Sequence, residues 1–536
     1  MVHHIDTALI ETTKPMMYQM HKWPGRKPSN IWAEHIKRYS KPREIVLDPF
    51  CGSGVAPIEA VIEGRKGIGL DLNPMAIFLT KMLAKHIDSS LEKKIKDTWD
   101  LLKKDFRTFE TMTNIYQTIC SGYLPRECTN SGITCQQCGK SARIINFRYK
   151  NTTELDQIAY KCECTRDTRK THGIPHPELF CLVKNADHSD KEKINKLNSG
   201  NFEDLQKNFI VCNKMSCWYW HPTDELPHTD EFENVRNSYG GNTYDILHPI
   251  HTLFSISYIF FKINEIKDPH VRDFFKLAFT SMIHLLTKVP VARNTPETCR
   301  FCSVSMGRLT FLYASNRVEP NPIMQFERAI EETQGLFAAK IYNNSKSSSN
   351  QRIKNKIKIA TTFDDLIKTR KNEQINFLIK KLDIFDLSSV IPKNSIDYVI
   401  TDPPYAGLVP YFDLTTQWTV WLKGNEQDDF FSVEFDKELT VDNTRNFDCV
   451  HYQRCLILAF KEIFDVLKPG KYMHVTFHNK DISVFNSLII ACRNAGFVLE
   501  HRPILQMNAR PGETGVSNPM GTALADFYFR FRKPKT

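Results

Sequence analysis

The chain has 536 residues, which at about 100 to 200 residues per domain indicates more than one folded unit. Charged residues make up 25% of the sequence and hydrophobic residues 41%, with 22 glycines and 27 prolines, so disordered and collagen-like proteins are excluded. The 71 Lys and Arg outnumber the 61 Asp and Glu by 10, an excess that suits a polyanionic partner but is also common in lysine-rich proteins that have none.

The sequence shows no membrane-targeting or secretory signal. The first residues, MVHHIDTALIETTK, include acidic side chains and have no continuous apolar core, unlike a secretory signal. The longest apolar stretch, near 253–261, is interrupted by Ser255 and Ser257 and is far shorter than the about 20 residues that span a bilayer. We therefore expect a soluble, intracellular protein that does not contact a membrane.

The first predicted elements are a strand, a glycine loop and a helix. EIVLD is a short apolar run that ends at Asp48, PFCGSG follows it, and VAPIEAVIEG has helical spacing up to Gly64. A second strand, KGIGLD, ends at Asp71 and precedes the helical pattern of NPMAIFLTKMLAKHI. This alternation predicts a parallel, doubly wound sheet that binds its ligand at the carboxyl ends of the strands.

The glycine loop and Asp71 predict a nucleoside site. Gly52 and Gly54 can adopt backbone angles closed to other residues, and a carboxylate at Asp71, at the tip of the next strand, suits two ribose hydroxyls. The third glycine of a dinucleotide motif is replaced by Pro57, and Asp48 would repel a pyrophosphate. The preferred ligand is therefore an adenosyl group without phosphates, as in S-adenosylmethionine.

The middle of the chain differs from both ends. Residues 115–240 are rich in Cys, Trp, His, Asn and Thr and show no sustained periodicity, which indicates a separate insert. Residues 244–286 predict two helices joined near Asp268 and Pro269, and the polar, basic stretch 343–358 predicts a linker. The aromatic residues Trp218, Tyr219 and Trp220 suit either base stacking or the core of a small domain.

The α/β alternation resumes in the last part of the chain. FLIKKLDIFDL, the strands SIDYVITD and YMHVTF, helices around CLILAFKEIFDVLKPG and VFNSLIIACRNAG, and a final strand ADFYFRFR follow one another. Together the two outer pieces have enough strands for one sheet. We therefore expect one α/β domain of doubly wound, Rossmann-like architecture, interrupted by the insert.

The tetrapeptide 402–405, Asp-Pro-Pro-Tyr, follows the strand SIDYVITD at the same edge as the glycine loop. Two prolines fix the backbone and remove two donors, so the turn presents carbonyl oxygens. The Asp402 carboxylate and the Pro403 carbonyl can accept the two hydrogens of an exocyclic amine and direct its lone pair toward an electrophilic methyl group, while Tyr405 stacks on the base. The pattern predicts methylation of an amine on a base.

These motifs resemble those of a known family. DPFCGSG with Asp71, and TDPPYAG preceded by DIFDL, resemble the paired motifs of the amino-methyltransferases that modify DNA. The Asp form of the tetrapeptide resembles the adenine-modifying branch more than the cytosine branch, which usually begins with Ser. HKWPGRKPSNIWAEHI looks like the family's N-terminal motif, which helps to cover the methionine end of the cofactor. With a cysteine-rich insert, WYWHPTDELP and a helical pair before the tetrapeptide, the order is similar to that of adenine-specific DNA methylases containing a zinc ribbon.

The resemblance covers about residues 15–105 and 375–530 and implies roles for particular residues. S-adenosylmethionine would be bound by His21, Lys27, Asp48, Phe50, Gly52, Gly54, Asp71 and Asp383, the last near its adenine ring. The catalytic residues would be Asp402, Pro403, Pro404 and Tyr405. The implied division is 1–110 and 365–536 for the cofactor-binding and catalytic parts of the methyltransferase domain, 111–240 for a zinc-ribbon insert and target-recognition candidate, and 241–364 for a helical insert and linker.

Two cysteine pairs in the insert predict a metal site. Cys135-x-x-Cys138 and Cys162-x-Cys164 have the spacing of two knuckles that clasp one tetrahedral zinc ion, although the second pair is one residue tighter than usual. Four thiolates leave no open position for water, so the zinc would be structural. A second set, Cys212, Cys217, Cys299 and Cys302, is irregularly spaced and is a weaker candidate.

The sequence therefore predicts an S-adenosylmethionine-dependent methyltransferase that flips adenine out of double-stranded DNA and methylates its N6 amine. The resemblance implies a prokaryotic, cytoplasmic, nucleoid-associated protein of a restriction–modification or related system, with a restriction endonuclease as a possible companion. Methylation of cytosine N4 or of RNA stays open, because the tetrapeptide recognises an amine and not the polymer. A DNA-binding scaffold without catalysis is disfavoured by the intact Asp71 and Asp402.

Overall fold

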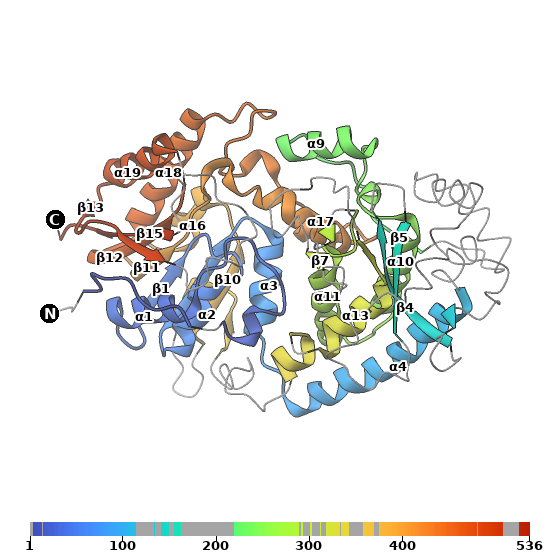
Figure 1. The fold of residues 1–536 in the computed structure, drawn as a ribbon. Coiled ribbons are helices and arrows are strands. Elements are labelled where there is room, and N and C mark those ends of the chain that lie inside the picture. The colour runs from blue at the N-terminus through green and yellow to red at the C-terminus, as the bar shows by residue number, and fades with distance from the viewer. Residues whose placement is uncertain are drawn as a thin grey trace.

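The structure is a computed structural model that shows a strand-rich part and a mostly helical part. In Figure 1 the large sheet lies on the left, together with both labelled chain ends, and the helical part lies on the right. The described residues are 4–12, 14–113, 133–134, 141–149, 155–161, 219–288, 291–292, 301–302, 311, 318–332, 334–341, 357–368, 375–479, 481–507 and 525–535.

The large sheet has nine strands in the order β13-β15-β12-β11-β1-β2-β10-β9, and β14 also pairs with β15. The six strands from β12 to β9 are parallel, and β15 is antiparallel to each of its partners. The strands are β1 (Ile45–Asp48), β2 (Lys66–Asp71), β9 (Ile359–Ala360), β10 (Phe377–Lys381), β11 (Ile396–Thr401), β12 (Leu467–Phe477), β13 (Val498–Leu499), β14 (Ile504–Met507) and β15 (Ala525–Arg532).

The order of the strands confirms that the two outer pieces of the chain form one sheet. β1 and β2, which precede the insert, lie between β11 and β10, which follow it. The α/β alternation and a largely parallel sheet are confirmed. The expectation of a wholly parallel sheet is wrong at one edge, because β14 and β15 are antiparallel neighbours and need no crossover helix.

Helices cover both faces of the sheet, and alternate residues of one strand enter different cores. On β1, Val46 packs in the core under α1 (Ser29–Tyr39), α2 (Val55–Ile62) and α3 (Pro74–Ala84). Ile45 and Leu47 point to the opposite core, because successive side chains of a strand alternate between its faces. That core is covered by α15 (Phe363–Ile367), α16 (Leu387–Val390), α18 (Cys449–Val466) and α19 (Ile482–Ala495).

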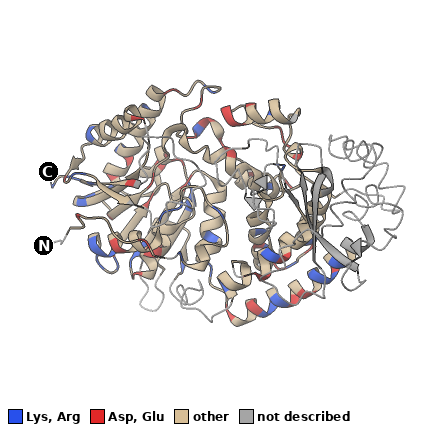
Figure 2. Cartoon of the chain, in the orientation of Figure 1, with Lys and Arg blue, Asp and Glu red and all other residues tan. Residues whose placement is uncertain are grey.

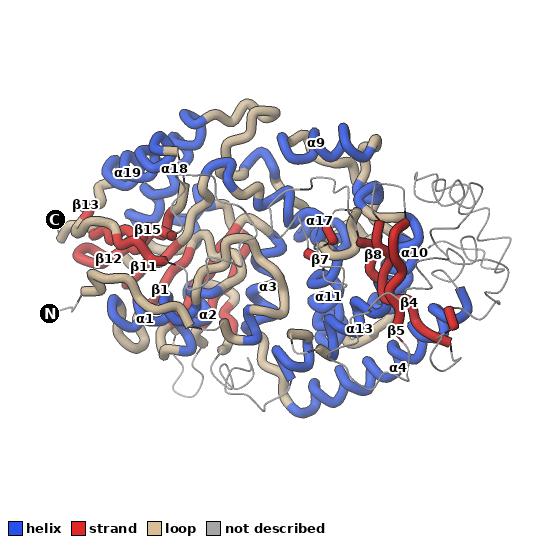
Figure 3. Tube along the Cα trace, in the orientation of Figure 1, coloured by secondary structure: helices blue, strands red, loops and turns tan. Residues whose placement is uncertain are grey.

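The second part of the molecule is mostly helical, as Figure 3 shows. The predicted helical pair is confirmed as α10 (Ile250–Asn264) and α11 (Pro269–Ile283), and the Asp268 side chain caps α11 by accepting hydrogen bonds from the backbone N–H groups of His270 and Val271. The other long helices are α4 (Ser89–Thr113), α9 (Asp230–Tyr239), α13 (Pro322–Glu331) and α17 (Tyr411–Lys423). Short helical turns are η1 (Met16–Tyr18), η2 (Tyr244–Leu247), η3 (Phe337–Ile341), η4 (Ile384–Asp386), η5 (Ala406–Leu408), η6 (Asp429–Phe431) and η7 (Phe435–Lys437).

The insert also contains strands that the sequence analysis missed. β4 (Ser141–Tyr149) pairs with β3 (Ile133–Thr134), β5 (Leu155–Lys161) and β8 (Val318–Pro320), and β6 (Val291–Ala292) pairs with β7 (Phe301–Cys302). The register between β4 and β5 shifts between Ile144 and Asn146. An extra residue in one strand interrupts the alternation of apolar and polar positions, so the period of two was not visible in SARIINFRY.

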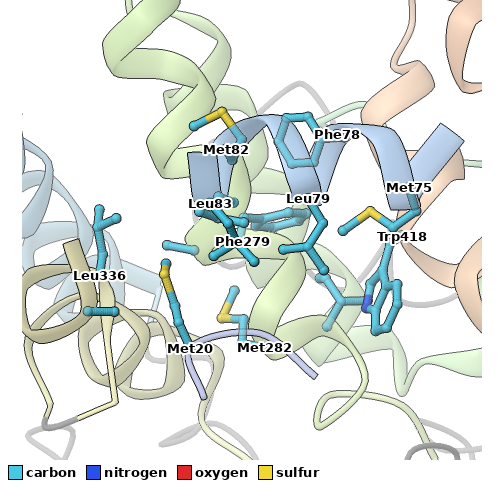
Figure 4. Packing of buried hydrophobic residues seen from close by; sticks show 14 of the residues in the cluster. Met20, Met75, Phe78, Leu79, Met82, Leu83, Phe279, Met282, Leu336 and Trp418 are labelled. Atoms are coloured by element: carbon cyan, nitrogen blue, oxygen red, sulfur yellow. The ribbon is translucent and has the colours of Figure 1, made fainter. Parts of the chain in front are cut away.

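The helical part and the sheet share one hydrophobic core through α3. Every residue of α3 except Lys81 is buried, as expected for a helix that is apolar on all sides. Figure 4 shows Met75, Leu79 and Met82 of α3 beside Phe279 of α11 and Trp418 of α17. The insert therefore packs directly against the helix that follows β2.

The basic residues of α4 are largely neutralised by neighbouring acids. Figure 2 shows basic and acidic segments alternating along this helix. Lys94 pairs with Asp268, Lys103 with Glu331, and Arg107 with Glu327. The described part of α4 therefore offers no uncompensated basic stripe to a polyanion. None of the helices in the described ranges combines the length and apolar character that a bilayer crossing requires.

Candidate functional site

A pocket of about 890 Å³ lies at the carboxyl ends of β1, β2, β10 and β11. This is the edge at which open α/β sheets bind their ligands. Of the residues predicted from the sequence, the lining includes Lys27, Asp48, Phe50, Gly52, Asp71, Asp383, Asp402 and Pro404. The glycine loop and the Asp-Pro-Pro-Tyr turn therefore open into one pocket, although they are separated by the insert in the sequence.

The glycine loop has the backbone conformation that its sequence requires. Gly52 and Gly54 have φ angles of +50° and +77°, in the left-handed region that favours glycine. The Gly52 N–H donates to Asp71 Oδ2 at 2.8 Å. A Cβ on Gly52 would lie 2.6 Å from Nε1 of Trp23, so this loop also needs glycine to admit the indole ring.

Two buried carboxyl groups lie at the base of the pocket. Asp71 at the end of β2 also accepts a hydrogen bond from the Asn73 N–H at 2.9 Å, and burial raises its pKa to about 6. Asp48 at the end of β1 accepts hydrogen bonds from the Thr401 hydroxyl at 2.7 Å and the Phe50 N–H at 3.2 Å. Burial raises the pKa of Asp48 to about 8.

The Cys51 thiol in the glycine loop is buried. Burial and the nearby carboxyl groups of Asp71 and Asp48 raise the pKa of this thiol well above its usual value. A thiolate is the nucleophilic form of cysteine, so these surroundings disfavour nucleophilic chemistry at Cys51.

The 402–405 turn follows β11 directly, and hydrogen bonds fix it on several sides. The Pro404 carbonyl accepts from the Tyr452 hydroxyl at 2.6 Å, and the Tyr405 carbonyl accepts from the Asn479 side chain at 3.0 Å. The Pro403 carbonyl accepts no hydrogen bond from the residues that the structure describes. Oδ1 of Asp402 accepts from the hydroxyls of Thr476 and Tyr405.

Tyr405 does not line the pocket in this structure. Its side chain is buried, its ring meets Phe477 edge-on at 5.1 Å, and its hydroxyl donates to Asp402 and accepts from Lys27 Nζ at 2.6 Å. The aromatic residues of the wall are instead Trp23, Trp32, Phe50, Tyr411 and Phe412. The stacking role of Tyr405 stays a prediction.

Trp23 and Tyr411 are pocket residues that the sequence analysis did not select. Their rings lie 6.3 Å apart with an interplanar angle of 27°. Trp23 belongs to the WPG segment of the N-terminal motif, and Tyr411 begins α17 soon after the tetrapeptide. An aromatic residue close to each motif is the signal that could have identified them.

The two residues predicted from the N-terminal motif lie in different places. Lys27 lines the pocket on the side of Asp402. His21 lies behind the wall, where its ring packs edge-on against Trp418 at 4.7 Å and its Nε2 is 3.2 Å from the Thr280 hydroxyl. Burial lowers the pKa of His21 to about 3, so it is neutral. This placement does not support a direct contact between His21 and a ligand in the pocket.

Asp383 and a loop from η7 close the remaining side of the pocket. Asp383 follows β10, accepts a hydrogen bond from the Phe385 N–H at 3.1 Å, and has a pKa raised by burial. Lys437, Glu438 and Leu439 also belong to the lining. Acidic residues on the wall (Asp48, Asp71, Asp383, Asp402 and Glu438) outnumber basic ones (Arg26, Lys27 and Lys437).

The predicted zinc ligands Cys135, Cys138, Cys162 and Cys164 lie outside the described residues, as do Cys212, Cys217 and Cys299 and the side chain of Cys302. Within the described ranges no three His, Cys, Asp or Glu side chains are grouped as metal ligands. Trp218 is also outside them, but Tyr219 packs against Tyr258 and Phe261, and Trp220 packs against Phe260 and Trp421. Tyr219 and Trp220 therefore contribute to packing of the helical part.

Comparisons with known proteins give one family and one solved protein. Residues 7–82 match the model of the family N6_N4_Mtase, described as DNA methylase. No curated protein matches the chain.

The solved structures are of a protein from Thermus thermophilus that is described as a candidate DNA modification methylase. Three of them, one complexed with S-adenosyl-L-methionine, are 18 to 19% identical to this chain, with TM-scores of 0.16 to 0.17. Each match covers 28% of this chain and 50 to 53% of the other, so the chain spans about half the length of these proteins. From the family match, residues 7–82, which supply the glycine loop and Asp71 of the pocket, belong to the N6/N4 DNA methylase family.

Proposed function

We propose that the protein is an S-adenosylmethionine-dependent DNA methyltransferase that modifies the exocyclic N6 amine of adenine. The observation that carries this proposal is the shared pocket, in which the glycine loop with Asp71 and the turn with Asp402 face each other. The family match of residues 7–82 supports methylation of DNA at an amine.

The pocket suits an adenosyl group with a positively charged neighbour. Asp71 is placed for the ribose hydroxyls, and Asp383 at the tip of β10 is placed for the adenine ring. The surplus of acidic side chains disfavours phosphates and favours the sulfonium and ammonium groups of S-adenosylmethionine. This cofactor supplies a methyl group that is electrophilic because it is bonded to a sulfonium.

The turn after β11 is placed to orient an amine. Asp402 and the carbonyl of Pro403 would accept one hydrogen each from the exocyclic amine, which turns its lone pair toward the methyl carbon. The nitrogen–carbon bond forms as the carbon–sulfur bond breaks with its electron pair going to sulfur, and one amine proton leaves by way of Asp402 to water. An adenine stacked inside a duplex would first have to be flipped out.

Adenine is proposed over cytosine because the tetrapeptide begins with Asp402, the form that resembles the adenine-modifying branch. The test is to incubate the purified protein and labelled S-adenosylmethionine with unmethylated genomic DNA or with RNA, and then to identify the labelled nucleoside by mass spectrometry. We expect N6-methyladenine in DNA. Label in N4-methylcytosine, or in RNA alone, would transfer the proposal to that substrate, and no label in either polymer would contradict it.

We also propose a structural zinc ion held by Cys135, Cys138, Cys162 and Cys164 in an insert that helps to select the DNA site. Replacing Cys135 and Cys138 with Ser should release about one zinc ion per chain and lower the melting temperature, because binding of a structural metal contributes to folding. Metal analysis of both proteins measures the first effect and thermal unfolding the second. Replacing Cys449, an exposed free cysteine, is the matched control. A wild-type protein without zinc would refute the site.

The biological setting is proposed from the resemblance alone: a prokaryotic restriction–modification or related host-marking system, in which a companion endonuclease would cut unmodified DNA.

A further inference from the structure

Lys27 forms the centre of a buried charge cluster beside Asp402. Its Nζ is 3.3 Å from Asp402 Oδ1, 2.8 Å from Asp526 Oδ2 on β15 and 2.6 Å from the Tyr405 hydroxyl. The side chains of Lys27, Asp402 and Asp526 are only 7%, 11% and 16% exposed. One ammonium group therefore joins the N-terminal motif, the catalytic turn and the strand next to β12.

The contacts distinguish the two oxygens of Asp402. Oδ1 accepts hydrogen bonds from the hydroxyls of Thr476 and Tyr405 and also faces the Lys27 ammonium. Oδ2 accepts no hydrogen bond from any described residue, and Asp402 lines the pocket. The cluster thus fixes one oxygen and leaves the other for a ligand in the pocket.

The charges in the cluster depend on one another. Burying an unpaired ammonium group costs several kcal/mol, and here two carboxylates offset that cost. Burial lowers the pKa of Lys27, but Asp402 and Asp526 outweigh burial and the pKa is raised overall. Lys27 is therefore charged at neutral pH.

We propose that Lys27 and Asp526 are positioning residues for methyl transfer: Lys27 holds Oδ1 of Asp402 so that Oδ2 meets the target amine, and Asp526 holds Lys27 from β15. This inference rests on the proposed function and assigns to Lys27 a partner other than the cofactor. Neither residue touches the reacting atoms.

Lys27 and Asp526 act on Asp402 in opposite directions. Burial raises the pKa of Asp402 to about 6, Lys27 lowers this pKa, and Asp526 raises it. The other titratable groups around Asp402 are Tyr405 in the same turn, Asp48 at the end of β1, Tyr411 on α17, Tyr452 on α18 and Tyr528 on β15. These tyrosines have raised pKa values and stay neutral, so Lys27 and Asp526 are the charged groups to vary.

The test uses the pH dependence of single-turnover methyl transfer to unmethylated genomic DNA by the full-length protein. Transfer needs ionised Asp402, so the wild-type rate should fall as the pH drops through about 6. In Lys27→Met this acid limb should move up by about one pH unit or more, and in Asp526→Asn it should move down. Lys27→Arg, which keeps the positive charge, should restore the limb toward the wild-type pH.

Lys468→Met is the matched control. Lys468 pairs with Asp397 at 2.7 Å near the start of β11, the strand that leads to Asp402, but far from the pocket end of that strand. This variant loses a partly buried ion pair and should keep the wild-type acid limb. Two acid limbs that stay at the wild-type pH in Lys27→Met and Asp526→Asn would show that these residues serve stability only.

Thermal unfolding tests the cluster without catalysis. Lys27→Met should lower the melting temperature, and adding Asp402→Asn should recover part of that loss, because it removes a buried carboxylate without a partner. Additive effects would overturn the positioning inference. A wild-type protein that transfers no methyl group would overturn the proposed function, and with it any role of the cluster in transfer, even if the two substitutions couple.

Discussion

Replacing Asp402 with Ala is expected to lower the rate of methyl transfer to DNA by about 1,000-fold or more, the scale of removing a group that stabilises a transition state. Asp402 would accept a hydrogen of the target amine, and no other described carboxylate lies on the turn after β11. Affinity for S-adenosylmethionine should change little, because Asp71 and the glycine loop are intact. Single-turnover kinetics measures the first effect and calorimetric titration with the cofactor the second.

The control for Asp402 is Asp402→Asn, which has the same size and retains one carbonyl oxygen. We expect it to lose rate as well, but less than Asp402→Ala, because a neutral oxygen is a weaker acceptor than a carboxylate. Circular dichroism would establish that both variants are folded. Unchanged turnover in a folded Asp402→Ala protein would end the catalytic assignment.

Replacing Gly52 with Ala should weaken binding of S-adenosylmethionine by about 100-fold, because a misplaced loop loses several close contacts at once. At a φ of +50° an added Cβ would be strained, and it would meet Nε1 of Trp23 at 2.6 Å. To relieve that contact, the loop or the indole ring would have to move into the pocket. Calorimetric titration with S-adenosylmethionine measures the change.

Gly64→Ala is the matched control for Gly52→Ala. Gly64 has a φ of +82°, but an added Cβ there has no heavy atom within 4 Å. Both substitutions therefore carry backbone strain, and only Gly52 faces the pocket wall. Cofactor affinity should stay near the wild-type value in Gly64→Ala, and equal losses in both variants would indicate general destabilisation.

The elements around the pocket could be predicted because local and global signals agree there. The strand that ends at Asp48, the glycine loop and α2 follow one another without interruption, and the structure places the two glycines at positive φ. Asp402 follows a strand that is buried at all six positions. Because parallel strands end at the same edge of a sheet, the two motifs could be expected to meet.

Helix α17 was missed because it offers no periodic contrast. All of its residues between Phe412 and Leu422 are buried, so apolar and polar faces do not alternate. Its threonines bond to carbonyls within the helix, as Thr415 does to Tyr411, which satisfies hydroxyls that otherwise disfavour a helix. Tyr411, the first residue of α17, could not be recognised as a pocket residue without this helix.

The side-chain orientations at the site depend on tertiary contacts that no local pattern contains. Tyr405 turns away from the pocket because Lys27 and Asp402 bind its hydroxyl. Lys27 faces Asp526, a residue 499 positions away in the sequence. His21 is held by Thr280 of the insert, so its distance from the pocket also follows from a contact between distant segments.

The most direct test is to sequence the DNA of cells that express the wild-type protein and of cells that express Asp402→Ala, and to score modified adenines with their neighbouring bases. The account predicts N6-methyladenine in one fixed sequence context in the wild-type cells, and its absence in the variant cells. Modified adenines that persist at the same sites in the Asp402→Ala cells, or no new mark in DNA from the wild-type cells, would contradict it.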